Sequence, residues 1–456
     1  MSRLACLMLV IFAFPTTMVM AAEPADQDQY VILISVDGLP HSSLNDPRAE
    51  LPTIRELARN GACADQGMVA SFPTVTWPNH TTLVTGVTPA RHGVLGNNYL
   101  DRETHKSVTL ITDPVFDKEE LVKVPTVYDA AAEAGLKTAG IVWPATRNAK
   151  NLHWNVPDMG RPDDWPRYAT PDWLAELQTA GLPVDKHSGW CKDSSGGVKR
   201  DWLYTRILAH AWKEQQPHLI LIHLVEVDHV EHRFGPKSPE AYWAVSYADD
   251  RVRDIVTTVR QSDRADKTTI IVASDHGFFP IHQDIRPNVL FKKLTDAQGD
   301  PAVKCVSQGG ACMIYLLDAA RKEELSRQVR EQLAEIEGVE QVYAPNRFDT
   351  IGQSVSSADQ RAPDLWAAAK SGYCFTDSSE GEITVVPRGE GGTHGYRPEH
   401  EDLLATLVMA GRNIRPGTKL GQVSNLDVAP TIAALLGISL PTADGHPLKA
   451  ALQQSP

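Results

Sequence analysis

The segment Tyr30-Val-Ile-Leu-Ile-Ser-Val36, followed by Asp37-Gly38, decides the fold class. It is almost entirely apolar and rich in β-branched residues, which is typical of a strand buried on both faces of a parallel sheet. A carboxylate follows its last residue at once. Because open α/β sheets bind ligands beyond the carboxyl ends of their strands, Asp37 is a candidate functional residue.

Further strand-like and helix-like segments alternate with this one along the chain. Strand patterns occupy residues 138–143, 218–225 and 268–273, and helical patterns occupy residues 126–134, 201–214 and 239–260. This alternation predicts an α/β doubly wound fold, a sheet with helices on both faces.

Two regions depart from the alternation. Residues 144–197 have little periodicity and are rich in Pro, Asp, Gly and Trp, so we expect an inserted cap or lid over the sheet edge. Its tryptophans have two open interpretations, packing of the lid and contact with a ligand. Residues 300–390 contain a β-α-β pattern that predicts a small side lobe. Both regions are expected to belong to one catalytic domain that spans residues 23–456.

Composition restricts the class of protein. The 456 residues are 42% hydrophobic and 22% charged, with a formal net charge of -13, as in a globular enzyme. This charge argues against a stable nucleic-acid-binding surface. It does not argue against a small anionic substrate, because bound cations would reverse the local charge. The sequence does not predict an oligomeric state.

The N-terminus has the pattern of an export signal. Residues 1–22 combine Arg3, an apolar run at 4–14 and a small-residue cleavage site. A membrane anchor is the weaker alternative, because Pro15 interrupts the run before it reaches a spanning length. We therefore expect an exported, periplasmic or secreted protein without a membrane span in the mature chain.

Five cysteines remain after the signal, an odd number that allows at most two disulfides. They are Cys63, Cys191, Cys305, Cys312 and Cys374. None has C-x-x-C spacing, which argues against a cysteine zinc cluster. Their pairing stays open, and we interpret them as structural residues.

The stretch Ser71-Phe-Pro-Thr-Val-Thr-Trp-Pro-Asn-His-Thr-Thr-Leu-Val-Thr-Gly86 supplies a candidate nucleophile. Thr76 ends an extended run, and Pro78 predicts a helix that begins near Asn79. Backbone N–H groups and the helix dipole favour an anion at such a position, so the Thr76 hydroxyl could attack phosphate. A plain N-cap is the alternative.

Carboxylates and histidines recur after other apolar runs. Asp228 and His232 are four residues apart, which places them on one face of a helical turn. Nitrogen and oxygen ligands of this kind suit zinc, and two adjacent metals can stabilise an in-line phosphoryl transfer. We expect two zinc sites, one formed by Asp37, Asp275, His276 and the Thr76 oxygen, the other by Asp228, His232 and His394. Each residue alone is commonly a turn former, and His229 is an alternative to His232, but their joint occurrence favours the metal sites.

Taken together, these motifs resemble the nucleotide pyrophosphatase/phosphodiesterase family of the alkaline phosphatase superfamily. The resemblance rests on Val36-Asp37-Gly38, Thr76–His80 with Leu83–Gly86, His92-Gly93 with Asn97, Asp228–His232 with Phe234–Pro236, Ser274–Gly277 and Gly392–Gly395. It implies an alkaline-phosphatase-like mixed sheet and two Zn²⁺ ions. It also implies hydrolysis of phosphodiester or pyrophosphate bonds through a phosphothreonine intermediate, with nucleotides as the expected substrates. By motif match, Thr76 is the nucleophile and Asn97 binds a phosphoryl oxygen.

Three positions depart from the family pattern. Trp77 replaces the usual phenylalanine, Glu231 stands where a glycine is common, and His223 stands where tyrosine is frequent. Trp77 and His223 are therefore the candidate substrate contacts. For Trp77, stacking on a nucleobase and packing against the lid are both open interpretations.

Other activities remain as alternatives. A phosphomonoesterase of the threonine type would resemble a subgroup with a Lys-x-Arg pair, which the sequence lacks, and phosphonoacetate hydrolysis stays open on the same scaffold. Sulfatase activity is disfavoured because no Cys-x-Pro-x-Arg motif occurs. A non-enzymatic binding module is disfavoured because all the expected metal ligands and Thr76 are present.

Overall fold

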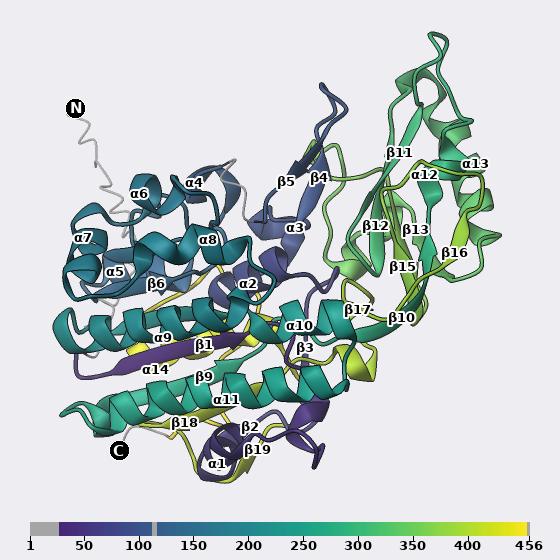
Figure 1. The fold of residues 1–456 in the computed structure, drawn as a ribbon. Coiled ribbons are helices and arrows are strands. Elements are labelled where there is room, and N and C mark those ends of the chain that lie inside the picture. The colour runs from purple at the N-terminus through teal and green to yellow at the C-terminus, as the bar shows by residue number, and fades with distance from the viewer. Residues whose placement is uncertain (1–26, 112–115, 454–456) are drawn as a thin grey trace, which may run out of the picture.

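A computed structural model describes residues 27–111 and 116–453 (Figure 1). The signal peptide expected at residues 1–22 lies outside the described residues. The described chain forms a large layered α/β body, from which a smaller group of sheets projects on the right in Figure 1.

An eight-stranded mixed sheet is the central layer. Its order is β19 (Thr418–Lys419), β2 (Ala62–Cys63), β18 (Leu407–Gly411), β9 (Thr268–Ala273), β1 (Tyr30–Val36), β8 (Leu219–Leu224), β6 (Thr138–Ile141) and β7 (Trp154–Val156). β1 pairs in parallel with β8 and β9, whereas β18 runs antiparallel to β9. The predicted mixed α/β sheet is therefore confirmed.

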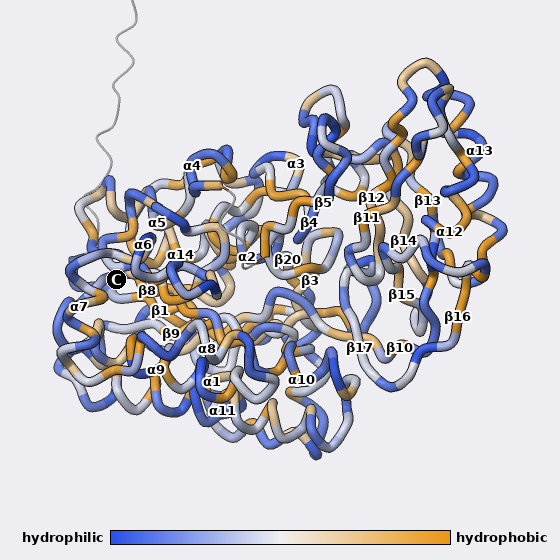
Figure 2. Tube along the Cα trace, turned by 45° about the horizontal axis from the view of Figure 1, so that its top comes forward, coloured by the Kyte–Doolittle hydropathy of each residue, from blue (hydrophilic) through white to orange (hydrophobic). Residues whose placement is uncertain are grey.

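Helices cover both faces of this sheet, as predicted. One face carries α1 (Pro52–Asn60), α7 (Pro171–Thr179), α9 (Gly196–Glu214) and α11 (Pro239–Arg260), and the other carries α2 (Thr76–Thr85), α5 (Val127–Glu133) and α14 (Val428–Leu436). β1 serves both cores, because Ile32 and Ile34 point to the first face and Val31 and Leu33 to the second. Figure 2 shows apolar residues concentrated in these central strands, with polar residues on the outer helices.

The projecting part contains two small sheets. The first consists of β11 (Val303–Ser307), β12 (Ala311–Leu316), β14 (Leu365–Ala369) and β13 (Val339–Tyr343), with helices α12 (Pro287–Phe291) and α13 (Lys322–Ala334) packed nearby. The second consists of β10 (Phe279–Ile285), β15 (Gly372–Phe375), β16 (Val385–Pro387) and β17 (Gly392–Thr393). This region includes the expected side lobe at 300–390, and its status as a separate domain stays a prediction.

Short elements complete the described chain. They are β3 (Met68–Val69), α3 (Pro89–His92), β4 (Asn98–Leu100), β5 (Ser107–Thr109), α4 (Lys118–Leu121), α6 (Asp164–Tyr168), α8 (His187–Cys191), α10 (Glu226–Phe234) and β20 (Val423–Ser424), with 3-10 turns η1 (His41–Leu44), η2 (Val184–Lys186), η3 (Ala265–Lys267), η4 (Ala319–Arg321), η5 (Pro345–Arg347), η6 (Asp349–Ile351), η7 (Glu401–Leu403) and η8 (Asn425–Asp427).

The region 144–197 differs from the expected cap over the sheet edge. Its strand β7 extends the main sheet beside β6, and Trp165 and Trp173 are buried in the same core as α9. A three-residue strand and helices of five to nine residues give no readable periodicity, which explains the difference. These two tryptophans pack the core of the protein.

Helix α2 begins earlier than predicted, at Thr76 instead of near Asn79. Val75 is extended and precedes the first turn, and Pro78 lies inside that turn, where its missing N–H needs no intrahelical partner. Thr76 is thus the first helical residue, so that its side chain lies directly at the helix N-terminus.

Two further expectations concern cysteines and membranes. All five cysteines of the described chain are free thiols. Within residues 27–111 and 116–453, no helix is both long and apolar enough to cross a membrane.

We predict that Asp249→Ala destabilises the fold. Asp249 is buried on α11, and its carboxylate accepts hydrogen bonds from the N–H groups of Thr53, at 3.0 Å, and Ile54, at 2.8 Å, in the first turn of α1. Leaving both donors unpaired should lower the free energy of unfolding by about 1–3 kcal/mol in urea titrations. Asp250→Ala is the control, since Asp250 only pairs with Arg253 on the exposed side of the helix and should matter little. Equal stability of the two variants would contradict the capping role.

Candidate functional site

The carboxyl ends of three parallel strands meet at one edge of the main sheet. Val36 of β1 is in register with Leu224 of β8, and Ser35 is in register with Ala273 of β9. Asp37 follows β1 directly, and its N–H donates to the carbonyl of Leu224 at 2.9 Å. The residues that follow these strands are therefore brought together.

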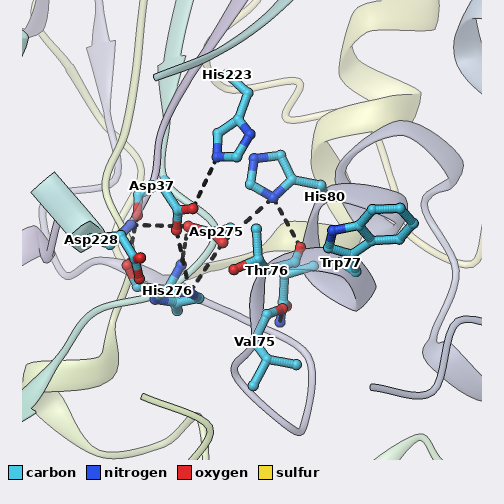
Figure 3. A network of polar contacts seen from close by, with 12 residues as sticks. Asp37, Val75, Thr76, Trp77, His80, His223, Asp228, Asp275 and His276 are labelled. Atoms are coloured by element: carbon cyan, nitrogen blue, oxygen red, sulfur yellow. Dashed lines mark hydrogen bonds and ion pairs between the residues drawn. The ribbon is translucent and has the colours of Figure 1, made fainter. Parts of the chain in front are cut away.

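Asp37, Asp275 and His276 form the first group of potential ligands (Figure 3). The Nε2 atom of His276 lies 3.4 Å from Oδ1 of Asp37 and 3.2 Å from Oδ2 of Asp275. All three side chains are buried. These are three of the four ligands expected from the sequence for the first metal site, the fourth being the Thr76 oxygen.

Asp228, His232 and His394 form the second group. Oδ1 of Asp228 lies 3.4 Å from Nε2 of His232, one turn later on α10, and 3.4 Å from Nε2 of His394. The two Nε2 atoms are 3.1 Å apart. His276 also lies within reach of Asp228 and His394, so the two groups are contiguous. The side chain of His232 is 43% exposed, and the site therefore opens to solvent on this side.

Backbone carbonyls orient the three imidazoles in the same way. The Nδ1 atoms of His232, His276 and His394 lie 3.1, 3.2 and 2.8 Å from the carbonyl oxygens of Gly392, Gly277 and Thr74 respectively. A carbonyl only accepts, so each Nδ1 carries the proton and each Nε2 presents a lone pair to the group. This is the tautomer that a metal-binding histidine needs.

The ligand side chains are buried and several of their polar atoms lack hydrogen-bond partners, which shifts their pKa values. Burial, and next the neighbouring negative charges, raise the pKa of Asp37 and Asp275 well above the usual range of a carboxyl group. Burial lowers the pKa of His394 to about 4. Four atoms of the two ligand groups have no hydrogen-bond partner among the described residues, namely Oδ1 of Asp37, Oδ1 of Asp228, Oδ2 of Asp275 and Nε2 of His276. These four unpartnered atoms converge and carry lone pairs, so bound cations could be coordinated by all of them.

Two glycines of the sequence motifs let segments approach the site closely. Gly38 has a φ of +75°, and a Cβ there would lie 2.9 Å from the ring of Phe278. Gly395 has a φ of +95°, and a Cβ there would lie 1.8 Å from the carbonyl oxygen of Gln308. Any side chain at either position would displace the loop that carries the adjacent Asp37 or His394.

Thr76 lies beside this constellation. Figure 3 shows it next to Asp275 and His276, with its hydroxyl turned toward that group. The residue is only 3% exposed. Asn97 is close by, because its Oδ1 accepts the N–H of Trp77 at 3.0 Å and its own N–H donates to Oε1 of Gln308 at 2.8 Å. The Trp77 N–H therefore binds Asn97, whereas the sequence predicts that the backbone N–H groups near Thr76 are free to bind an anion.

His223 is buried beside Asp37, at the end of β8. It is 2% exposed, and its Nε2 is 2.9 Å from Oδ2 of Asp37, while its Nδ1 is 3.2 Å from the carbonyl oxygen of Val142. A contact of His223 with substrate stays a prediction. In the structure the imidazole lies against the outer oxygen of Asp37, while Oδ1 of Asp37 is directed toward His276 (Figure 3).

Sequence reasoning gave no role to three residues of this network. His80 lies under the site, with its Nδ1 2.9 Å from the Thr76 carbonyl oxygen and 3.5 Å from Oδ2 of Asp275. Gln308 positions Asn97 from a loop more than 200 residues away. Asp158 is partly buried, with Oδ2 4.0 Å from Nδ1 of His223. Only His80, one turn after Thr76, carried a sequence signal that could have been used.

Trp77 points away from the metal-ligand groups, into an apolar cluster. Its indole is 6% exposed and lines a small recess together with Phe116, Ala145, Asp158 and Met159. The recess begins one residue after Thr76.

Comparison with known proteins places the chain in a family. The model of the type I phosphodiesterase/nucleotide pyrophosphatase family matches residues 31–397. An uncharacterized pyrophosphatase/phosphodiesterase of Schizosaccharomyces pombe is 27% identical over 261 residues, which are 55% of this chain and 45% of the relative. Ectonucleotide pyrophosphatase/phosphodiesterase family member 3 of Rattus norvegicus is 24% identical over 90% of this chain and 42% of its own length. The chain thus spans less than half of the length of these two relatives.

Solved structures share the fold. Murine ectonucleotide pyrophosphatase/phosphodiesterase 5, as an inactive variant in complex with AMP, superimposes with a TM-score of 0.66 at 17% identity, covering 92% of this chain and 96% of the murine chain. The strand-end geometry and the family match lead to the same assignment. The protein belongs to the type I phosphodiesterase/nucleotide pyrophosphatase family.

Proposed function

We propose that the protein hydrolyses phosphodiester or pyrophosphate bonds of small nucleotide substrates through a phosphothreonine intermediate on Thr76. One observation carries the proposal, the position of this buried hydroxyl at the N-terminus of α2 beside two contiguous groups of unpartnered metal-ligand atoms. Membership of the family supports the same bond types. The murine neighbour in complex with AMP supports a nucleotide as substrate.

Two zinc ions are the proposed cofactors. Asp37, Asp275, His276 and the Thr76 oxygen would hold one ion, and Asp228, His232 and His394 would hold the other. The mixed nitrogen and oxygen donors suit zinc better than magnesium or calcium, which prefer all-oxygen sites. When bound, the ions supply Lewis-acid stabilisation of negative charge that develops on the substrate.

The protein's own groups then perform the reaction in two displacements. The Thr76 oxygen forms a bond to phosphorus as the bond to the leaving oxygen breaks, and the hydroxyl proton is released to solvent. Water next attacks the phosphothreonine, the bond between phosphorus and the Thr76 oxygen breaks, and the hydroxyl is regenerated. The net change adds one water across the original phosphoester or phosphoanhydride bond.

Asn97 is the proposed donor to a phosphoryl oxygen. The Trp77 N–H fixes its Oδ1, so the side-chain NH₂ group is oriented away from that contact. Gln308 holds its backbone from the other side. A donor fixed in this way stabilises charge in the transition state without reorganising.

Export and choice of substrate complete the proposal. Relatives named as ectonucleotide enzymes support an exported protein with a small substrate, in line with the signal peptide expected at residues 1–22. Phosphomonoester or phosphonoacetate hydrolysis on the same scaffold is the alternative. Trp77, the residue that follows Thr76, is the side chain proposed to stack on an aromatic group of the substrate.

We predict that Thr76→Ala removes turnover and leaves the fold and the metal content largely intact, because Asp37, Asp275 and His276 remain at the first site. Loss of the attacking oxygen should lower kcat on p-nitrophenyl thymidine monophosphate on the order of 10³-fold or more, because no other nucleophile takes its place. Thr76→Ser should retain part of the activity, since it keeps a hydroxyl. Elemental analysis of both variants checks the metals. Wild-type rates in Thr76→Ala would replace the covalent route by direct attack of water.

For Trp77→Ala, we predict a selective loss on nucleotide diesters. Stacking of a base on the indole is worth about 1–3 kcal/mol, or about tenfold in KM per 1.4 kcal/mol. KM for p-nitrophenyl thymidine monophosphate should rise, whereas KM for a methyl phosphodiester should change little. Equal losses on both substrates would show that Trp77 only supports the loop that carries Thr76.

We predict that Asp275→Asn stabilises the metal-free protein and destabilises the zinc-bound protein. Because the folded pKa of Asp275 lies above its unfolded value, its contribution to the stability of the metal-free protein is present below about pH 4 and is lost as pH rises through the folded pKa. Asparagine cannot ionise, keeps Oδ1 for the N–H groups of Gly38 and His276, and can donate to Nε2 of His276. In chelator at neutral pH the variant should therefore unfold at a higher temperature than wild type, and in zinc at a lower one.

The control for this comparison is Asp364→Asn. Asp364 is equally buried but is paired with Arg102 at 3.0 Å and Lys322 at 2.6 Å, far from the site. Its substitution should lower stability at neutral pH with and without zinc. A metal-free Asp275→Asn protein that is less stable than wild type at every pH would argue against the unpaired charge.

A further inference from the structure

A second cavity of about 120 Å³ lies behind the metal-ligand groups, between α10, α11 and the loops after β1 and β9. Its apolar wall is formed by Pro40, Pro236, Ala241, Val245, Phe278 and Pro280. Phe278 separates the cavity from the proposed metal site, because its ring packs edge-on against His232 and His394 at centroid distances of 4.9 and 5.1 Å. The cavity is thus adjacent to the site without being part of it.

Three carboxylates line this cavity, and two of them form ion pairs with basic side chains. Asp46 accepts a hydrogen bond from the Tyr242 hydroxyl at 2.6 Å and pairs with Arg48. Asp402 pairs with Lys237 at 2.9 Å. Within the described chain, these interactions leave the third carboxylate, Glu231, as the one whose charge is not paired.

Glu231 is the unusual feature of the cavity. It is 2% exposed, and its Oε2 has no hydrogen-bond partner among the described residues. Its carboxyl group interacts electrostatically with Asp228, which repels its charge, and more weakly with Lys237 and the Tyr242 hydroxyl, which line the same cavity. A buried carboxylate in this position needs a positively charged or hydrogen-bond-donating partner.

The lining defines the chemistry of that partner. One unpaired carboxylate cannot replace the six to eight oxygen ligands of a hard metal ion, and the clusters of three potential metal ligands in the described chain lie on the other side of Phe278. An ammonium group, in contrast, needs a single carboxylate and is attracted to aromatic faces such as those of Phe278 and Tyr242. The proline, alanine and valine side chains suit the alkyl part of the same molecule.

We propose that this cavity binds a small organic ammonium ion, with its cationic nitrogen at Glu231 and its alkyl groups against Phe278, Ala241 and Val245. The site is distinct from the phosphoryl site and does not depend on the reaction proposed above. Glu231 is adjacent to His232 on α10, so an occupied cavity would pack against the back of a metal-ligand turn.

The test is calorimetric titration of the zinc-loaded protein with tert-butylammonium chloride, and with tert-butanol as a neutral probe of the same shape. We expect the ammonium ion to bind about tenfold or more tightly than the alcohol, since only the ion satisfies the carboxylate. Glu231→Gln should lose this preference by about tenfold or more. The absence of measurable binding to the wild-type protein, or equal affinity in Glu231→Gln, would overturn the proposal.

Glu226→Gln is the matched control. Glu226 is on the same helix, is 3% exposed and has an unpartnered Oε2, but it does not line the cavity. This variant should bind the ammonium ion like wild type, and a loss here equal to that in Glu231→Gln would refute a specific site. Ala241→Leu provides a second route, because it keeps the charge of Glu231 and fills the cavity. It should abolish binding, and unchanged affinity in a folded Ala241→Leu protein would also overturn the assignment.

Discussion

Two carboxylates buried side by side, Asp37 and Asp275, constrain the whole site. Each has one oxygen in contact with hydrogen-bonding groups of the protein: Oδ2 of Asp37 lies 2.9 Å from Nε2 of His223, and Oδ1 of Asp275 accepts from the N–H groups of Gly38 and His276. The other oxygen of each is unpartnered within the described chain and faces His276. Such an arrangement is unfavourable for the metal-free fold, because the charges are desolvated and repel each other. The surrounding hydrogen bonds are what keep the unsatisfied oxygens directed at one point.

The same constraint links the segment of Thr76 to the distant segment of His394. The Thr74 carbonyl accepts from Nδ1 of His394 and from the N–H of Gly395, and the Thr74 hydroxyl donates to the carbonyl of Tyr396. A shift of the loop before α2 would therefore move His394 with it. The proposed nucleophile and the second metal site are coupled through the backbone, which keeps their relative position fixed more effectively than side-chain packing alone.

The sequence predicted those parts of the molecule that depend on local pattern. Strands β1 and β9 and helix α11 follow from uninterrupted apolar runs or helical spacing, and the metal-ligand candidates follow from their position after such runs. Contacts between distant residues were not predictable, such as that of Gln308 with Asn97 or of His223 with Asp37, because no short motif encodes them. The prediction for residues 144–197 failed for another reason, because strands and helices this short show no recognisable hydrophobic periodicity.

Helix α10 shows how one element can serve two environments. Asp228 and His232 are four residues apart and share the face toward His394, whereas Glu231 projects to the cavity behind Phe278. A glycine at position 231 would weaken the helix by roughly 1 kcal/mol. A buried carboxyl group without a partner costs more than that, about 1–3 kcal/mol even when it is uncharged. Glu231 therefore cannot be explained as a device for helix stability, and its energetic cost is offset only when a donor or a cation occupies the space in front of it.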